Sequence, residues 1–145
     1  MSPERTLTIL FRIIGAVLLL AAPAAFLPTD WMASVHAWLG LGEMPRGPLV
    51  EYLTRSVSAL YAFHGALFLL VSTDVRRYRT VALLFGAGDV VFGLAIFGIG
   101  LRAGLPPLWL WNEGPPTALI GLLILWLARR VPRVPAVEAA PGRAR

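Results

Sequence analysis

The sequence predicts an all-α integral membrane protein: a four-helix bundle with a short interfacial helix in its first outer loop. The chain has 145 residues, of which 57% are hydrophobic and only 14% are charged. An ordinary soluble domain has about a quarter of its residues charged. The mean hydropathy is +0.71, and four long apolar stretches divide the chain. A soluble core of this size could not hide so much apolar surface, so a bilayer must solvate much of it.

The four apolar stretches are the predicted membrane spans. A helix needs about 20 residues to cross the hydrocarbon region, and the first three stretches reach that length. The fourth is shorter, so it needs a thinned bilayer or residues borrowed from the preceding loop. The stretches cover residues 6–27, 49–72, 80–101 and 116–131. Residues 1–131 are therefore predicted to form one transmembrane domain, and residues 132–145, which lack periodicity, a disordered cytoplasmic tail.

The arginines predict the orientation. Of those that flank the apolar stretches, nine fall on one side, whereas the other side has only Arg46 and Arg102. By the positive-inside rule the nine mark the cytoplasmic side. The sequence therefore predicts a multi-pass protein of the bacterial inner membrane with both termini in the cytoplasm. The nine are Arg5, Arg76, Arg77, Arg79, Arg129, Arg130, Arg133, Arg143 and Arg145.

Residues 1–24 also fit a second interpretation. They have the charged start, apolar centre and small-residue end of a secretory signal. Cleavage near Ala24 would leave three spans and an external amino terminus. The apolar run is long for a signal, which favours a first span, but the sequence leaves both interpretations open.

The first outer loop, residues 28–48, predicts a helix that lies flat at the membrane interface. Thr29 or Asp30 can cap such a helix. Trp31 and Trp38 then fall on one face, where indole rings favour headgroup depth.

The second outer loop, residues 102–116, carries Trp109 and Trp111 and predicts an interfacial or shallow re-entrant segment. Residues 112–116 are expected to form a turn whose prolines open the last helix. The loop at residues 73–79 is short, so the spans on either side of it should form an antiparallel hairpin.

Asp89 is the single charge in the stretch from Val81 to Leu101. Burying an ionisable group in a bilayer costs a few kcal/mol or more, so it requires a partner. Small residues on the same helix face let a neighbouring helix approach closely. We therefore expect Asp89 to face packed protein near the midplane rather than lipid. The stripe consists of Gly86, Asp89, Gly93, Phe97 and Gly100.

Two basic side chains are candidate partners of Asp89. His64 falls at nearly the same depth, with Tyr61 about one turn away. Arg12 lies roughly 6 Å nearer the cytoplasm, which an extended guanidinium covers. A buried salt bridge between Arg12 and Asp89 that fixes the helix register is the favoured interpretation, and a ligand-binding or proton-handling role for Asp89 is the alternative.

The second apolar stretch carries the most polar face of the chain. Glu51 and Arg55 are four residues apart in the order that favours an ion pair on a helix. Packed against the Asp89 stripe, this face would form a polar interior. The candidate ligand-binding residues are Arg55, Tyr61, His64 and Asp89, and the candidate structural polar residues are Arg12, Glu51 and Ser58.

Several kinds of chemistry are excluded or disfavoured. The chain has no cysteine, which excludes disulfides, thiol catalysis and thiolate metal sites. It also lacks the metalloprotease, phosphate-loop and serine-hydrolase motifs. There are only two histidines, and His36 lies outside the predicted spans, so haem ligation by two histidines is not expected. We expect no cofactor, no metal, no catalytic residue and no nucleic-acid partner, and the question of enzymatic activity stays open with a non-catalytic role favoured.

The opening LFRIIGAVLLL and the four-span layout resemble small bacterial membrane proteins of the DoxX-like kind and neighbouring uncharacterised families. The stretches EYLTRSVSALYAFHGALFLLVS and WNEGPPTALIGLLILWL resemble parts of such an uncharacterised family. The resemblance implies an inner-membrane protein that works beside a partner enzyme or complex.

Three functional hypotheses follow, in order of preference. The first is a non-catalytic accessory or structural membrane subunit. The second is a binding protein for a small lipophilic molecule, a quinone or a lipid, in a polar cleft between the second and third spans. The third is a small transporter or membrane enzyme that uses Asp89 and His64 for proton transfer. The expected partners are the lipid bilayer and either another membrane protein or a lipophilic small molecule.

Overall fold

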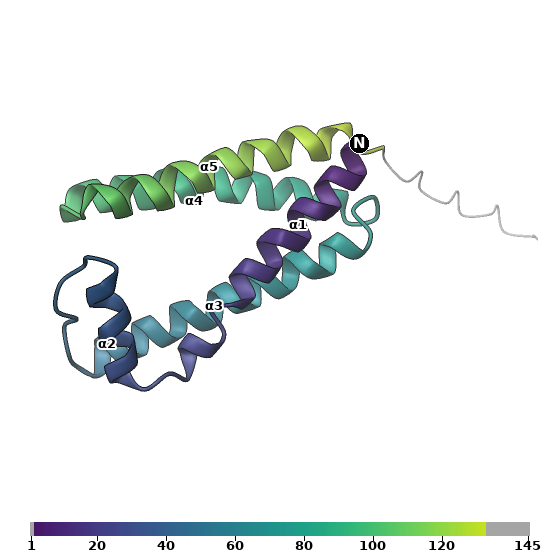
Figure 1. Cartoon of the computed structure of the whole chain (residues 1–145). Coiled ribbons are helices and arrows are strands. Elements are labelled where there is room, and N and C mark those ends of the chain that lie inside the picture. Colours follow the sequence, from purple (N-terminus) through teal and green to yellow (C-terminus); the bar gives the residue numbers. More distant parts are fainter. Residues whose placement is uncertain (1, 133–145) are drawn as a thin grey trace, which may run out of the picture.

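The computed structural model describes residues 2–132, which fold into five α-helices and one short 3₁₀ turn (Figure 1). No strand occurs in these residues, so the predicted all-α class is confirmed. The predicted tail, residues 132–145, lies outside the described part of the chain except for Pro132. The elements are α1 (Pro3–Leu19), η1 (Pro23–Ala25), α2 (Thr29–Trp38), α3 (Pro48–Thr73), α4 (Arg79–Ala103) and α5 (Pro107–Arg130).

Three helical stretches in residues 2–132 are long and apolar enough to cross a membrane: Pro3–Ala25, Pro48–Thr73 and Arg79–Ala103. They match the first three predicted spans, and the loop between the last two is as short as predicted. The helix predicted in the first outer loop is present as α2. By length and composition these helices are compatible with membrane spans.

α5 differs from the prediction at its start. The helix begins at Pro107 rather than Pro116, and the turn predicted at residues 112–116 is wrong because Pro115 and Pro116 lie inside the helix. A proline at the first helical position loses no intrahelical hydrogen bond, so Pro107 opens the helix without cost. A proline normally pushes the residue before it out of the helical region by a clash that involves the Cβ atom. Gly114 has no Cβ, which relieves part of that clash at Pro115.

The four long helices form two antiparallel pairs, α1 with α3 and α4 with α5 (Figure 1). The pairs come together at the end that holds the start of α1 and the end of α5. They diverge toward the opposite end, where α2 lies beside the start of α3. We call the end where the pairs come together the closed end, and the opposite end the open end.

Glycines let the two helices of each pair approach closely. A methyl group on Gly93 of α4 would lie 2.6 Å from the carbonyl oxygen of Gly114 and the amide nitrogen of Ala118 on α5. A methyl group on Gly65 of α3 would lie 2.7 Å from the carbonyl oxygen of Gly15 on α1. The close approach predicted for the α4 stripe is confirmed, and the neighbouring helix is α5.

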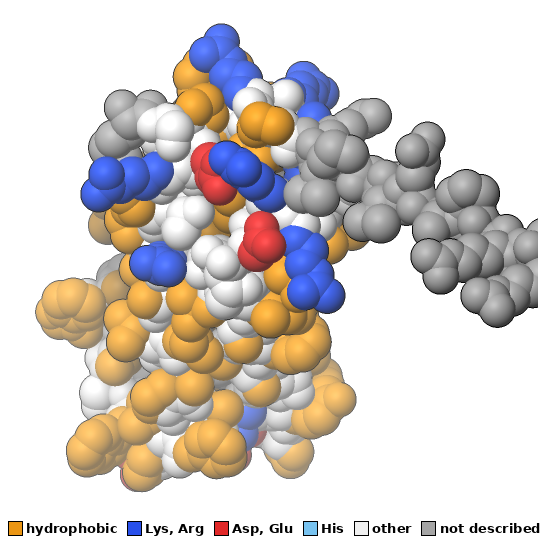
Figure 2. Space-filling view, turned by 90° about the vertical axis from the view of Figure 1, so that its right-hand side faces the viewer, with side chains coloured by type: hydrophobic (Ala, Val, Ile, Leu, Met, Phe, Trp, Pro, Cys, Tyr) orange, Lys and Arg blue, Asp and Glu red, His pale blue; other side chains and the backbone are white. Residues whose placement is uncertain are grey.

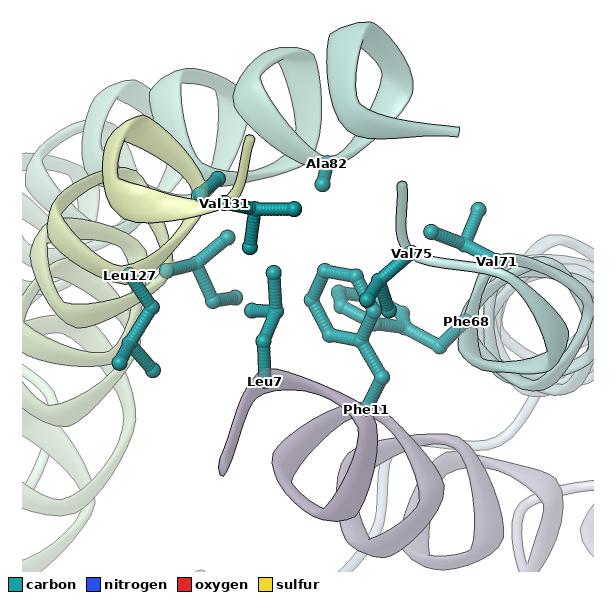
Figure 3. Packing of buried hydrophobic residues seen from close by; sticks show 10 residues of the cluster. Leu7, Phe11, Phe68, Val71, Val75, Ala82, Leu127 and Val131 are labelled. Carbon is teal, nitrogen blue, oxygen red and sulfur yellow. The ribbon is translucent and has the colours of Figure 1, made fainter. Parts of the chain in front are cut away.

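An apolar core joins the two pairs at the closed end (Figure 3). Phe11 of α1 lies between the pairs and meets Phe68 of α3 edge-on, with ring centroids 5.1 Å apart. Fully burying side chains of this size stabilises a structure by about 1.5–3 kcal/mol each, although lipid reduces that value for the parts it would otherwise cover. The core consists of Leu7, Phe11, Phe68, Val71, Val75, Ala82, Ile124, Leu127, Ala128 and Val131.

The same end carries a crowded set of arginines (Figure 2). Arg76 makes an ion pair with Glu4 at 2.6 Å, and the Nε atom of Arg79 donates to the carbonyl oxygen of Val131 at 3.0 Å. Arg46 and Arg102 lie at the opposite end. Six of the nine arginines predicted to share one side are described, and these six gather at one end: Arg5, Arg76, Arg77, Arg79, Arg129 and Arg130.

Candidate functional site

Asp89 of α4 meets His64 of α3 just beyond the apolar core. The Oδ1 atom of Asp89 lies 4.0 Å from the Nε2 atom of His64, which makes an ion pair when the imidazole is protonated. Both side chains keep some access, with 16% of the Asp89 side chain and 37% of the His64 side chain exposed. On its other side Asp89 packs beside Gly121 of α5, because a methyl group on Gly121 would lie 3.0 Å from the Asp89 Cβ atom.

The ring of His64 rests on the aromatic edge of the core. Its centroid lies 4.9 Å from that of Phe68 and 5.2 Å from that of Phe85. Phe85 precedes Asp89 by one helical turn, so the same face of α4 supplies both the ring below His64 and the carboxylate beside it. This packing holds the imidazole at the level of Asp89.

A second polar contact joins α3 to α5. The hydroxyl of Tyr61 donates to the Oε1 atom of Glu113 at 3.4 Å, and both residues are half-buried. Tyr61 precedes His64 by nearly one turn of α3, so the two contacts lie next to each other. We call these four residues the polar seam: Tyr61, His64, Asp89 and Glu113.

The favoured salt bridge between Arg12 and Asp89 is wrong, because no such pair occurs in the described residues and the Arg12 side chain is exposed. The buried face of α1 is Leu7, Phe11 and Gly15, spaced every four residues. Arg12 follows Phe11 directly, and successive helical residues are rotated by about 100°. Arg12 therefore points away from the interior, and the second candidate, His64, is the basic side chain that lies beside Asp89, at 4.0 Å.

Arg55 and Ser58 of the predicted polar face bond elsewhere. The Nη1 atom of Arg55 donates to the carbonyl oxygen of Ala25 at 3.0 Å, which ties α3 to η1. The ion pair predicted between Glu51 and Arg55 is not formed within the described residues, so that prediction is wrong. The hydroxyl of Ser58 donates to the carbonyl oxygen of Thr54 in its own helix. Of the four candidate ligand-binding residues, Tyr61, His64 and Asp89 come together and Arg55 does not join them.

Glu113 is the member of the seam that is absent from the candidate site residues predicted from the sequence. It was assigned to a turn, whereas the structure places it on α5. Once α5 begins at Pro107, the spacing Glu113, Thr117, Ile120 and Ile124 predicts an inward face, since Ile124 is fully buried. That signal depends on the position of the helix start.

A pocket of about 290 Å³ lies under α2, away from the seam. Its walls come from α2, from the chain just before and after it, from the start of α3 and from Trp109 of α5. His36 lines it and its Nδ1 atom lies 3.1 Å from the carbonyl oxygen of Gly42. The candidate ligand-binding residues do not line this pocket.

Residues 2–132 contain no cluster of three or more histidine, aspartate or glutamate side chains that could hold a metal ion. Comparison with known proteins finds no family model that matches the chain, and no matching curated protein or solved structure. The function must therefore be argued from the side chains described above.

Proposed function

We propose that the protein is a non-catalytic accessory subunit of the bacterial inner membrane that crosses the bilayer as a bundle of four helices, α1, α3, α4 and α5. α5 has 24 residues, which at about 1.5 Å per residue is long enough for the hydrocarbon thickness of about 30 Å. The arginine-rich end faces the cytoplasm, together with both termini. α2 lies at the outer interface, where the exposed Trp31 and Trp38 are at headgroup depth.

The observation that carries the non-catalytic role is the internal pairing of the polar seam. Asp89 lies 4.0 Å from His64, and the Tyr61 hydroxyl is bonded to Glu113. In the described residues no buried side-chain nitrogen or oxygen lacks a hydrogen-bond partner. Polar groups that satisfy one another inside a membrane fix which helices pack and in which register. The contacts within the seam thus support a structural role.

A partner surface is available on α4. Gly88 and Gly98 have no atom within 4 Å of the place where a Cβ would stand, so they face away from the rest of the chain. Leu84 and Val91 are exposed on the same helix. In a bilayer, small residues on an open helix face allow another helix to approach closely. A helix of the partner subunit is proposed to pack here, in line with the resemblance to DoxX-like proteins.

Native co-purification tests this proposal. The tagged full-length protein is extracted in mild detergent as wild type, as Gly88→Leu and as Ala66→Leu, a matched control at an exposed alanine of α3. We expect one stoichiometric partner with wild type and the control, and its loss from Gly88→Leu. The three proteins should unfold at closely similar temperatures, since Gly88 has open space around it and leucine is a good helix former. A wild-type protein that never brings down a partner refutes the subunit role.

A second candidate function is binding of a lipophilic molecule such as a quinone between α3 and α4. The observation that favours it is the partial exposure of Asp89 on α4 and of His64 on α3. The carbonyl or hydroxyl groups of such a ligand would form hydrogen bonds with the side chains of the polar seam in place of the contacts that these side chains make with one another. Asp89→Asn separates the two functions by thermal stability and by retention of added ubiquinone. Lost stability with unchanged retention supports the subunit, whereas unchanged stability with lost retention supports the binding protein.

A further inference from the structure

The pocket under α2 has an apolar wall and a fixed frame. Met32 of α2 and Met44 of the following loop are each only 7% exposed, and both line the pocket. Methionine side chains adapt to irregular apolar shapes. No aspartate, glutamate or arginine is part of the wall. Its composition therefore suits a hydrocarbon group rather than a charged one.

Contacts at both ends of α2 join it to the loop that forms one wall of the pocket. At the start of the helix Asp30 lies 3.6 Å from Arg46, which joins α2 to the far end of the loop that carries Met44. At its end the ring of His36 is bonded to the carbonyl of Gly42. The loop turns back through Gly42 with φ of 80°, a conformation that glycine adopts easily. The loop is thereby held across α2 as one wall of the pocket.

The charges around the pocket are nearly balanced, unlike those at the opposite end. Residues 28–55 contain three acidic residues, two arginines and His36, whereas the closed end carries a clear excess of arginine. Anionic headgroups are attracted to arginine-rich surfaces. A headgroup that carries one positive and one negative charge is better matched to the balanced rim. The charged residues of the segment are Asp30, Glu43, Glu51, Arg46 and Arg55.

From these features we propose that the pocket under α2 holds one acyl chain of a zwitterionic phospholipid of the outer leaflet. The volume of about 290 Å³ is just below the range of about 300–1,000 Å³ usual for small-molecule pockets, so the pocket has room for part of one chain and not for two chains. α2 covers the chain, and the headgroup stays at the level of Trp31 and Trp38. The inference rests on the membrane placement proposed above and not on the partner subunit.

Native mass spectrometry of the delipidated full-length protein tests the site. Palmitoyl-oleoyl phosphatidylethanolamine is the zwitterionic probe, and the matching phosphatidylglycerol is the anionic probe. Ala24→Phe and Val50→Trp fill the pocket from two different walls. Ala37→Phe and Leu53→Trp are matched controls, since both residues are exposed and neither lines the pocket.

We expect one phosphatidylethanolamine per protein in wild type and in both controls, and at least tenfold less in both pocket-filling variants. Adducts of phosphatidylglycerol form at the arginine-rich end and should be the same in all five proteins. Unchanged phosphatidylethanolamine binding in the two variants overturns the site, and equal loss of both lipids overturns the headgroup preference. Co-purification of the partner should not change in Ala24→Phe, so failure of the lipid site and failure of the subunit role are distinguishable.

A quenching measurement needs no pocket-filling variant. Trp109 lines the pocket, whereas Trp126 lies near the arginine-rich end beside Arg130. Two single-tryptophan proteins are made, one that keeps Trp109 and one that keeps Trp126, with the other four tryptophans replaced by phenylalanine. Phosphatidylethanolamine with a brominated acyl chain is added to each at one molecule per protein. We expect at least threefold stronger quenching of Trp109 than of Trp126. Equal quenching of the two would overturn the proposal.

Discussion

The substitution Gly93→Ala tests how closely α4 and α5 approach. The added methyl group would lie 2.6 Å from the Gly114 carbonyl oxygen and the Ala118 amide nitrogen, and 3.0 Å from the Ala118 Cβ atom. Ordinary contacts of a Cβ atom begin near 3.4 Å. The two nearest atoms belong to the backbone, so no side-chain rotation relieves the contact. The helices must therefore separate by most of an ångström over this region.

The expected cost follows from two opposing effects. Overpacking of a close contact costs about 1–3 kcal/mol, and sometimes more. Alanine is the better helix former by about 1 kcal/mol, which offsets part of that cost. Gly88→Ala, five residues earlier on the same helix, places its methyl group in open space and keeps only the helix-forming gain. The two variants should therefore differ by about 2 kcal/mol in the free energy of unfolding.

Reversible unfolding in mixed micelles of sodium dodecyl sulfate and a mild detergent measures that difference. We expect Gly93→Ala to be less stable than wild type and Gly88→Ala to be at least as stable. The additional change Ala118→Gly should not rescue Gly93→Ala, because the two shortest contacts are with backbone atoms. If the two single variants were equally stable, the close approach of α4 and α5 would be refuted.

Three smaller perturbations follow from the other contacts. A double-mutant cycle on His64→Gln and Asp89→Asn should give a coupling of about 0.6 kcal/mol and no more than about 1.7 kcal/mol in the same unfolding assay, and no coupling would show that the two side chains do not interact. Tyr61→Phe should cost at most about 0.5 kcal/mol by thermal unfolding, since its hydrogen bond to Glu113 is long at 3.4 Å, and a larger loss would contradict that geometry. Arg79→Gln should lower the free energy of unfolding by about 1 kcal/mol, because Arg79 donates a hydrogen bond to the carbonyl oxygen of Val131 just after α5. Arg77→Gln, at an exposed position, should change it by less than about 0.5 kcal/mol. Equal effects of the two substitutions would contradict the role given to Arg79.

Much of the fold could be predicted from the sequence because membrane solvation demands long uninterrupted apolar helices. The bounds of the first three predicted spans differ by a few residues from those of the helical stretches in the structure. The turn at residues 73–79 was visible because charged residues break two apolar runs. The Gly86 and Gly93 stripe indicated a close helix contact, and the structure adds that α5 makes it.

The start of α5 could not be read from local signals. Two proline pairs, at residues 106–107 and 115–116, are each typical of a helix start. The apolar run begins only after the second pair, which favoured the wrong one. Tertiary packing decides between the two proline pairs, because the segment from Pro107 onward packs on α4. Leu110 lies close to Gly100, and Gly114 lies close to Gly93. Packing against a neighbouring helix outweighs the cost of an internal proline.

The partner of Asp89 was misjudged for a different reason. Depth along the helix axis puts both Arg12 and His64 within reach of Asp89, but depth alone does not include the direction in which the Arg12 side chain faces. The spacing of Leu7, Phe11 and Gly15 already marked the inner face of α1 and excluded Arg12 from it. The bond from Arg55 to the Ala25 carbonyl joins segments far apart in the chain, and no local pattern predicts it.

The unequal strength of the two ends bears on how the protein moves. At the closed end the helix pairs share ten buried apolar residues, including Phe11 and Phe68. Toward the open end the polar contacts between the pairs are the 4.0 Å pair of His64 with Asp89 and the 3.4 Å bond of Tyr61 to Glu113. Polar contacts of this kind contribute about 0.6 kcal/mol each on average in a membrane protein. Opening of the helix pairs therefore costs little at the seam itself, and a ligand that enters between α3 and α4 would displace these two polar contacts.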